Sequence, residues 1–289
     1  MQRNAATGEI IYSPEDMLLF RQSPFACWME RLTLENPDHG IAPDSEVNAA
    51  NTDHYARLSR RQRVQTGRHL ARGMAWQEFI AAGATLAVHA EAQPAGGERA
   101  LHVNDAGDSS LIARFACEQQ RVTATLDAMQ QGLRYIAQAQ LLVGPLSCHV
   151  DLLLRVDGVS DFGSYLYLPC DTRGTLRRHR AFHLAFAADL LANLQGVEPP
   201  EMLVLLEGEP IETLRTADHL PLFRAVRKRF LTAELAFRKH CMPDPTESAH
   251  FGRWTRCAQD LLKHRATASL AARGPAVVHA LDRALGEKS

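Results

Sequence analysis

Two aspartates and an arginine lie in segments that have the alternating pattern of β-strands. Residues 150–156 and 165–173 place an apolar side chain at nearly every second position, with Asp151 in the first segment and Asp171 and Arg173 in the second. Successive strand side chains point to opposite faces, so Asp171 and Arg173 share a face, about 7 Å apart. Carboxylates are ligands that Mg²⁺ prefers, and a cation beside them stabilises phosphate. The pattern therefore predicts a site for a hard metal ion and a phosphate, on two neighbouring strands at the sheet edges.

The same residues also have a purely structural interpretation. Asp151 could be neutralised by Arg155 or by His149, and Asp171 could simply end a strand. Spacing alone leaves both interpretations open, because strand periodicity reports the face of a side chain and not its partner.

Composition restricts the class of protein. The 289 residues are 46% hydrophobic and 22% charged, as in ordinary globular proteins. The 32 Lys and Arg balance 33 Asp and Glu, so any phosphate-binding surface must be local. The six cysteines form no CxxC pair, and no apolar run reaches the eighteen or so residues that span a bilayer. We therefore expect reduced thiols, a cytoplasmic location and no membrane partner.

The order of the expected elements predicts the fold class. We expect strands at 133–143, 150–156, 165–173 and 202–206, with a helix at 178–194 before the last strand. The last strand is continuously apolar, as in a strand that is parallel to its neighbour and covered on both faces. This order predicts an α/β fold with a mixed central β-sheet flanked by helices, and with additional N- and C-terminal helices.

The remaining segments are expected to be mainly helical and to belong to one domain, 1–289. Two short helices near the start are separated at Pro24. They are followed by a long helix at 55–82 and a short strand at 85–91, and further helices are expected at 122–131, 221–240 and 254–285. Within the single domain, we assign 1–82 to N-terminal helices, 83–210 to the sheet core with its crossover helix, and 211–289 to C-terminal helices.

Residues 151–156 (DLLLRV) followed by 165–173 (YLYLPCDTR) resemble the PD-(D/E)XK nuclease superfamily, and specifically the RecB-like putative nucleases, whose second motif commonly reads Asp-Thr-Lys. Residues 13–32, 125–139 and 190–199 are similar to other parts of that family in the same order. The resemblance covers most of the chain. It implies a restriction-endonuclease-like core and metal-dependent hydrolysis of DNA.

The resemblance also implies a role for each matching residue. Asp151 and Asp171 would ligate one or two Mg²⁺ or Mn²⁺ ions, the carbonyl of Thr172 would complete the coordination sphere, and Arg173 would contact water and phosphate. The family has lysine at position 173. Arginine stays protonated, so it stabilises phosphate but poorly replaces a lysine that exchanges protons. Two functions therefore remain: an attenuated nuclease, or a catalytically inactive pseudonuclease that binds DNA or joins a complex.

Three further features follow from the resemblance. His183 and Ala187 occupy the positions of a Gln-x-x-x-Tyr pattern on the crossover helix of the family. His69 resembles a helix histidine that binds metal in some members. Many relatives hold an iron–sulfur cluster or zinc through clustered cysteines, but only Cys257 is retained near the C-terminus, so no iron–sulfur cluster is predicted.

Basic residues follow the candidate site and recur on a later expected helix. The first cluster contains Arg177, Arg178 and Arg180, and the second contains Arg227 and Lys228. Together they suit a DNA backbone channel without sequence-specific readout. No GxxxxGK[ST] loop is present, so a helicase partner would be a separate chain. A third possibility is that the sheet is a scaffold whose helices bind a protein partner.

Overall fold

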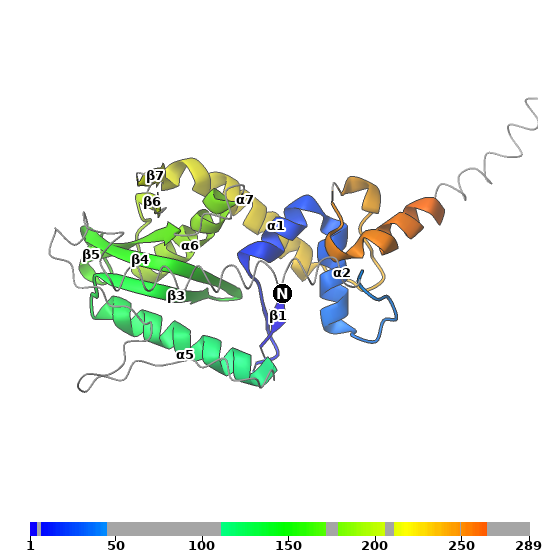
Figure 1. Ribbon diagram of the computed structural model, residues 1–289, viewed down its shortest axis with the longest axis horizontal. Coiled ribbons are helices and arrows are strands. Elements are labelled where there is room, and N and C mark those ends of the chain that lie inside the picture. The colour runs from blue at the N-terminus through cyan, green and yellow to red at the C-terminus, as the bar shows by residue number, and fades with distance from the viewer. Residues whose placement is uncertain (5–6, 45–110, 172–178, 206–210, 249, 265–289) are drawn as a thin grey trace, which may run out of the picture. The chain divides into compact units, whose positions relative to one another are not determined.

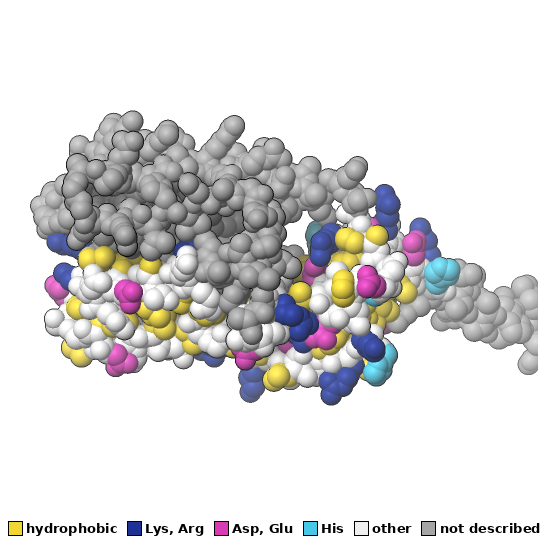
Figure 2. Space-filling view, turned by 90° about the horizontal axis from the view of Figure 1, so that it is seen from below, with side chains coloured by type: hydrophobic (Ala, Val, Ile, Leu, Met, Phe, Trp, Pro, Cys, Tyr) yellow, Lys and Arg dark blue, Asp and Glu magenta, His cyan; other side chains and the backbone are white. Residues whose placement is uncertain are grey.

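The computed structural model describes residues 1–4, 7–44, 111–171, 179–205, 211–248 and 250–264 (Figure 1, Figure 2). For residues 111–117 it describes the backbone and not the side chains. The chain divides into two compact units, Met1–Met17 with Thr52–Glu234 and Leu18–Asn51 with Leu235–Ser289. Residues 1–82, which we expected to form one group of N-terminal helices, are thus shared between the two units. The helix expected at 55–82 and the strand expected at 85–91 lie outside the described residues.

A five-stranded mixed sheet in the order β3-β4-β5-β6-β7 organises the first unit (Figure 1). Its strands are β3 (Tyr135–Val143), β4 (Leu146–Ser160), β5 (Gly163–Asp171), β6 (Glu201–Val204) and β7 (Glu212–Arg215). Neighbours are antiparallel except β5 and β6, which are parallel and joined through a crossover helix. The mixed α/β sheet and the order of three strands, helix and strand are confirmed. The short, exposed β7 was not predicted, because it lacks an apolar alternation.

The helices of the model begin and end close to the expected positions, with two exceptions. They are α1 (Pro14–Gln22), α2 (Pro24–Glu35), α5 (Leu111–Gln130), α6 (Arg180–Gln195) and α7 (Thr216–Leu235). Helix α5 begins well before the expected residue 122. Helix α7 begins before Pro221, which has no N–H to donate to the helix. Thr216 and Leu220 are buried in its first turns, and their packing offsets the missing hydrogen bond.

The alternation along β4 and β5 gives the sheet two different faces. Leu152, Leu154 and Cys170 belong to an apolar cluster that continues onto β3 and β6. Asp151 and Asp171 alternate onto the opposite face, as the pattern predicts. Both strands are interior strands of the sheet, however, so the expectation of carboxylates at sheet edges was wrong. Because each of these strands is paired on both sides, its carboxylate is buried, whereas an edge strand would expose it.

The C-terminal end of α5 is held by side chains from the sheet. The hydroxyl of Tyr165 donates hydrogen bonds to the carbonyl oxygens of Met129 and Gln130, at 3.0 and 3.1 Å. Arg155 donates to the carbonyl oxygen of Gly132 and lies over the Tyr165 ring. These contacts satisfy carbonyls that a helix end leaves without partners. Arg155 is therefore committed to α5.

Gln195, the last residue of α6, hydrogen-bonds to the backbone of β5 at a position that is not paired with β6. Its side-chain oxygen accepts from the Tyr167 backbone N–H at 2.9 Å, and its amide nitrogen donates to the Tyr167 carbonyl at 3.4 Å. Gly196 follows in the left-handed conformation, with φ of 70°, and ends the helix. The amide thus fixes the far end of α6 to the strand that carries Asp171.

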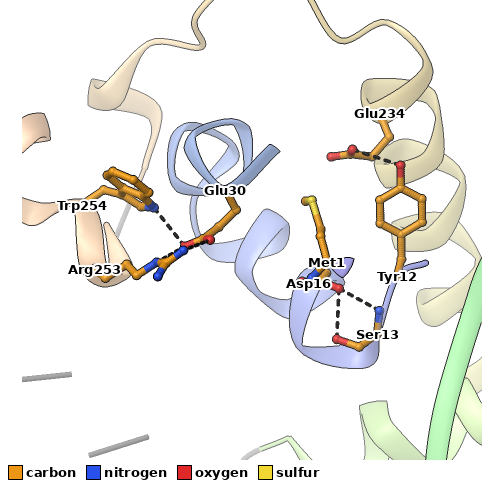
Figure 3. Close-up of polar contacts among 8 residues, drawn as sticks. All are labelled: Met1, Tyr12, Ser13, Asp16, Glu30, Glu234, Arg253 and Trp254. Carbon is orange, nitrogen blue, oxygen red and sulfur yellow. Dashed lines mark hydrogen bonds and ion pairs between the residues drawn. The ribbon is translucent and has the colours of Figure 1, made fainter. Parts of the chain in front are cut away.

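The N-terminal segment is tied to both α1 and α7 in the first unit. Two short strands, β1 (Gln2–Arg3) and β2 (Ile10–Ile11), precede α1. Asp16 accepts from the backbone N–H and hydroxyl of Ser13, at 2.8 and 3.0 Å, and pairs with the Met1 amine. Figure 3 also shows Tyr12 donating to Glu234 of α7. The hydrogen bonds between Ser13 and Asp16, an acidic residue in the first turn, therefore stabilise the start of α1.

The second unit contains α2 and segments near the end of the described chain. Ser23 caps α2 by accepting from the Ala26 N–H at 2.9 Å, which explains the break between the first two helices. Glu30 accepts from both Arg253 and the Trp254 indole, so it links α2 to the later segment (Figure 3). That segment contains η1 (Pro245–Glu247), η2 (Gly252–Trp254) and helical residues 255–264.

Replacing Gln195 with methionine tests the link between α6 and β5. Gln195→Met preserves side-chain length but leaves a buried N–H and a buried carbonyl without their partner, so we expect a loss of about 2 to 4 kcal/mol in unfolding free energy. Urea unfolding measures it. Asn193→Ala, at an exposed position of the same helix, should change stability by less than about 0.5 kcal/mol. Equal effects of the two changes would contradict this role.

Candidate functional site

The β4–β5 register brings the two predicted aspartates together. Leu152 is paired with Cys170, and one further step along the antiparallel ladder places Asp151 opposite Asp171. Residues directly opposite each other have Cβ atoms about 4.5 to 5.5 Å apart. Only 3% of Asp151 and 5% of Asp171 is exposed. The site therefore begins as a buried, facing pair of carboxylates.

The electrostatics of Cys170 reflect both carboxylates. Burial raises the pKa of the Cys170 thiol, and the charges of Asp151 and Asp171 raise it further. Cys170 lies on the apolar face, adjacent in sequence to Asp171 and opposite Leu152. Its thiol therefore stays protonated in the folded protein and is a packing group rather than a nucleophile.

Arg180 supplies a buried positive charge to the pair. Its Nε donates to Asp171 Oδ2 at 3.0 Å, and its Nη1 lies 3.9 Å from Glu212 Oε2. Only 7% of Arg180 is exposed. We expected Arg180 on a DNA-contacting surface, but this first residue of α6 points into the fold, because a buried carboxylate needs a nearby cation.

His149 and Gln138 lie beside Asp151. His149 Nδ1 is 3.9 Å from Asp151 Oδ1, and His149 Nε2 is 3.1 Å from Gln138 Oε1. His149 is one of the two residues that the structural interpretation of the sequence named as a partner for Asp151. Gln138 was not among the predicted site residues. The glutamines at positions 138 and 140 interrupt an otherwise apolar strand at alternate residues, and this pattern could have indicated a polar site on that face.

A second polar group continues the same face of the sheet. Gln140 Nε2 donates to Ser147 Oγ at 2.7 Å and to Glu118 Oε1 at 3.1 Å. Ser147 Oγ donates to the same Glu118 oxygen at 2.7 Å. Positions 147, 149 and 151 of β4 are thus all polar and share a face. We call Ser147, His149 and Asp151 the polar stripe of β4.

A cavity of about 240 Å³ in the first unit borders this stripe. Glu15, Glu118, Gln140, Ser147, His149 and His183 contribute to its wall. His183 Nδ1 lies 3.8 Å from Glu15 Oε1, so this helix histidine faces α1. His149 reaches both the cavity and Asp151, and His183 lines the cavity beside Glu15.

The basic residues of α7 are arranged differently from one another. Arg224 Nε donates to Asp189 at 2.8 Å, and Arg227 pairs with the other oxygen of this buried carboxylate. The hydrogen bond to Asp189 raises the pKa of Arg224. Lys228 is exposed. Arg227 therefore holds α7 against α6, and Lys228 points to solvent.

The view in Figure 2 shows few Lys and Arg side chains on the described surface at the left, and neutral and hydrophobic groups separate them. A basic channel is not visible on that part of the described surface. The remaining candidate residues lie outside the described residues: His69, Thr172, Arg173, Arg177 and Arg178.

The donor atoms present suit a hard divalent cation. Asp151 and Asp171 offer carboxylate oxygens from two interior strands, which are the ligands that Mg²⁺ and Mn²⁺ accept. Within the described ranges, no group of three or more His, Cys, Asp or Glu side chains is arranged to hold a metal ion. Ligation would thus use the two aspartates together with water, substrate or backbone oxygens.

No protein-family model and no curated protein matches the chain. Among the helices that the structure describes, none combines the length and apolar character needed to cross a membrane. An assignment of function therefore depends on the facing carboxylates and on the motif resemblance.

Removing the cation from the carboxylate pair should be costly. Arg180→Met leaves two buried carboxylates opposite each other, so we expect the unfolding free energy at neutral pH to fall by about 3 to 5 kcal/mol. Arg224→Met is the matched control, because Asp189 keeps Arg227. A thermal or urea unfolding series measures both. The interpretation fails if the control loses as much stability as Arg180→Met.

The raised pKa of Cys170 predicts a pH dependence of stability. The thiol is neutral in both states below its ordinary pKa of 9.0. Above that pH the unfolded chain releases the proton while the folded protein keeps it, so stability falls as pH rises. Urea unfolding at about pH 8 and about pH 10 should show this fall, and Cys170→Val should reduce it. An unchanged slope in the variant would contradict the assignment.

Proposed function

We propose that the chain is a metal-dependent DNA nuclease of RecB-like type that hydrolyses phosphodiester bonds at Asp151 and Asp171. One observation carries the proposal: the two aspartates face each other on interior strands. The strand after the second aspartate's strand is parallel and is reached through a helix. This order accords with the restriction-endonuclease-like core that the motif resemblance implies.

The residues would divide the chemistry as follows. Asp151 and Asp171 would hold Mg²⁺ or Mn²⁺ with the Thr172 carbonyl, and the ion when bound supplies charge neutralisation and an activated water. Arg180 orients the Asp171 carboxylate through its hydrogen bond. Arg173, protonated throughout the physiological range, would stabilise charge on the phosphate. We propose DNA as substrate without sequence-specific readout.

A second function is favoured by the Arg180–Asp171 ion pair. A buried guanidinium already gives Asp171 the positive charge that a metal ion would otherwise supply. Arg173 also replaces the lysine of the family motif. The alternative is therefore a catalytically inactive pseudonuclease that binds DNA or joins a complex, for example with a helicase on another chain.

Cleavage assays separate catalysis from structure. Linear duplex and single-stranded DNA are incubated with the protein and Mg²⁺ or Mn²⁺. Asp151→Asn should lower the rate by at least ~100-fold, because it removes a ligand charge at the reacting centre. Asp157→Asn, at an exposed position of the same strand, should leave the rate within about twofold. Undiminished cleavage by Asp151→Asn would refute the proposed centre.

DNA binding and Arg173→Lys distinguish the two functions. A wild-type protein that binds DNA without cutting it, together with an Arg173→Lys variant that cuts, would establish the pseudonuclease. A protein that neither binds nor cuts DNA would remove the nuclease and the DNA-binding pseudonuclease, and would leave a complex-forming subunit or the protein-binding scaffold. Binding is measured by fluorescence anisotropy with labelled single-stranded DNA.

A further inference from the structure

We propose that the cavity of about 240 Å³ in the first unit binds a primary alkylammonium ion. This inference goes beyond the nuclease function and does not depend on it. It is carried by the hydrogen-bonding groups that the cavity wall leaves available, by an acceptor without a partner on a buried side chain, and by the charge of the wall.

The hydroxyl groups that line the cavity already donate their protons to other side chains. Ser147 Oγ donates to Glu118 at 2.7 Å, and Ser13 Oγ donates to Asp16 at 3.0 Å. The Tyr12 hydroxyl donates to a carboxylate of α7 at 3.2 Å. Because a hydroxyl carries a single proton, these groups can only accept a hydrogen bond from an occupant of the cavity.

Gln140 presents an acceptor that has no partner in the described part of the chain. Its Nε2 donates to Glu118 Oε1 and to Ser147 Oγ, which uses both amide protons and leaves the side-chain oxygen without a hydrogen bond. Only 7% of Gln140 is exposed, and the residue lies in the cavity wall. A buried acceptor without a donor is costly, so we expect the occupant of the cavity to donate a hydrogen bond.

The carboxylates of the wall outnumber its fixed cations. Glu15, Asp16 and Glu118 line the cavity, and among the described residues no Lys or Arg does. The Met1 amine pairs with Asp16. Glu118 accepts its hydrogen bonds from neutral amide and hydroxyl groups. At about pH 8, where a histidine of ordinary pKa is neutral, the wall therefore carries a net negative charge.

An ammonium group matches these features better than a phosphate or a metal ion does. It carries one positive charge and several N–H donors and has no acceptor of its own. A phosphate offers mainly acceptors and negative charge, which this wall would repel. A metal ion would need several ligand atoms close together, and the described residues include no such group of three His, Cys, Asp or Glu side chains.

The size of the cavity limits the ligand to a small group. Its volume of about 240 Å³ lies below the roughly 300 to 1,000 Å³ of pockets for drug-sized molecules. A short aliphatic amine or a single amine-bearing side chain is of suitable size. The ammonium group could therefore come from a free polyamine or from a lysine of a partner protein, and the experiment below separates these two sources.

The test measures binding of butane-1,4-diamine by titration calorimetry at about pH 8, without metal or DNA. Gln140→Met keeps the side-chain length and removes the acceptor, so the dissociation constant should rise about 10-fold or more. Glu15→Gln removes a charge at an exposed position, where the fold tolerates the change, and should raise it about threefold. Glu201→Gln, exposed on β6 and outside the cavity wall, is the matched control and should leave it unchanged.

Two further probes define the ligand. Tetramethylammonium has the same charge as one ammonium group but no N–H, so it should bind at least about 10-fold more weakly than methylammonium. Tighter binding of Nα-acetyl-lysine methylamide than of the diamine supports a lysine of a partner protein, and the reverse order supports a free polyamine.

Three results would overturn the inference: no amine binding by wild type, equal binding of tetramethylammonium and methylammonium, or an affinity for the diamine that Glu15→Gln and Glu201→Gln change equally. None of them bears on the nuclease, because DNA cleavage is measured separately.

Discussion

The burial of two carboxylates opposite each other is the constraint on which the site depends. Like charges directly across a ladder destabilise a sheet, and burial removes the water that would screen them. Arg180 meets part of this demand at Asp171, and His149 approaches Asp151. A divalent cation would meet it more fully. The two proposed functions differ in whether the metal or the protein's own cation provides this charge.

A single sheet carries this charged site because its two faces differ. One face of β4 and β5 packs Leu152, Leu154 and Cys170 into an apolar cluster, which favours the folded state by removing apolar surface from water. The other face becomes polar along the stripe that ends at Asp151. Hydrogen bonds among Ser147, Gln140 and Glu118 satisfy the far end of that stripe. The favourable free energy of burying the apolar face therefore offsets the cost of burying charge on the opposite face.

Residues beside the site stabilise the elements that position it. Arg155 shares a face with Asp151 by alternation, yet it holds the end of α5. Gln195 secures the end of α6 to β5, and Arg180 begins that helix at the other end, at Asp171. Anchoring α6 at both ends restricts its position relative to the carboxylates. This rigidity would favour a precise metal or phosphate geometry, and it equally suits a fixed binding surface.

The sequence by itself determined the two faces of β4 and β5, the order of strands and crossover helix, and the approach of Asp151 to Asp171. These follow from local periodicity and from short connections. Only the tertiary structure decided that Arg180 is buried, that Gln138 leaves the ladder, and that residues 18–51 group with the C-terminal segment. The physical reason is that periodicity records which side of its own segment a residue occupies. The partner it meets there depends on packing between segments distant in the chain.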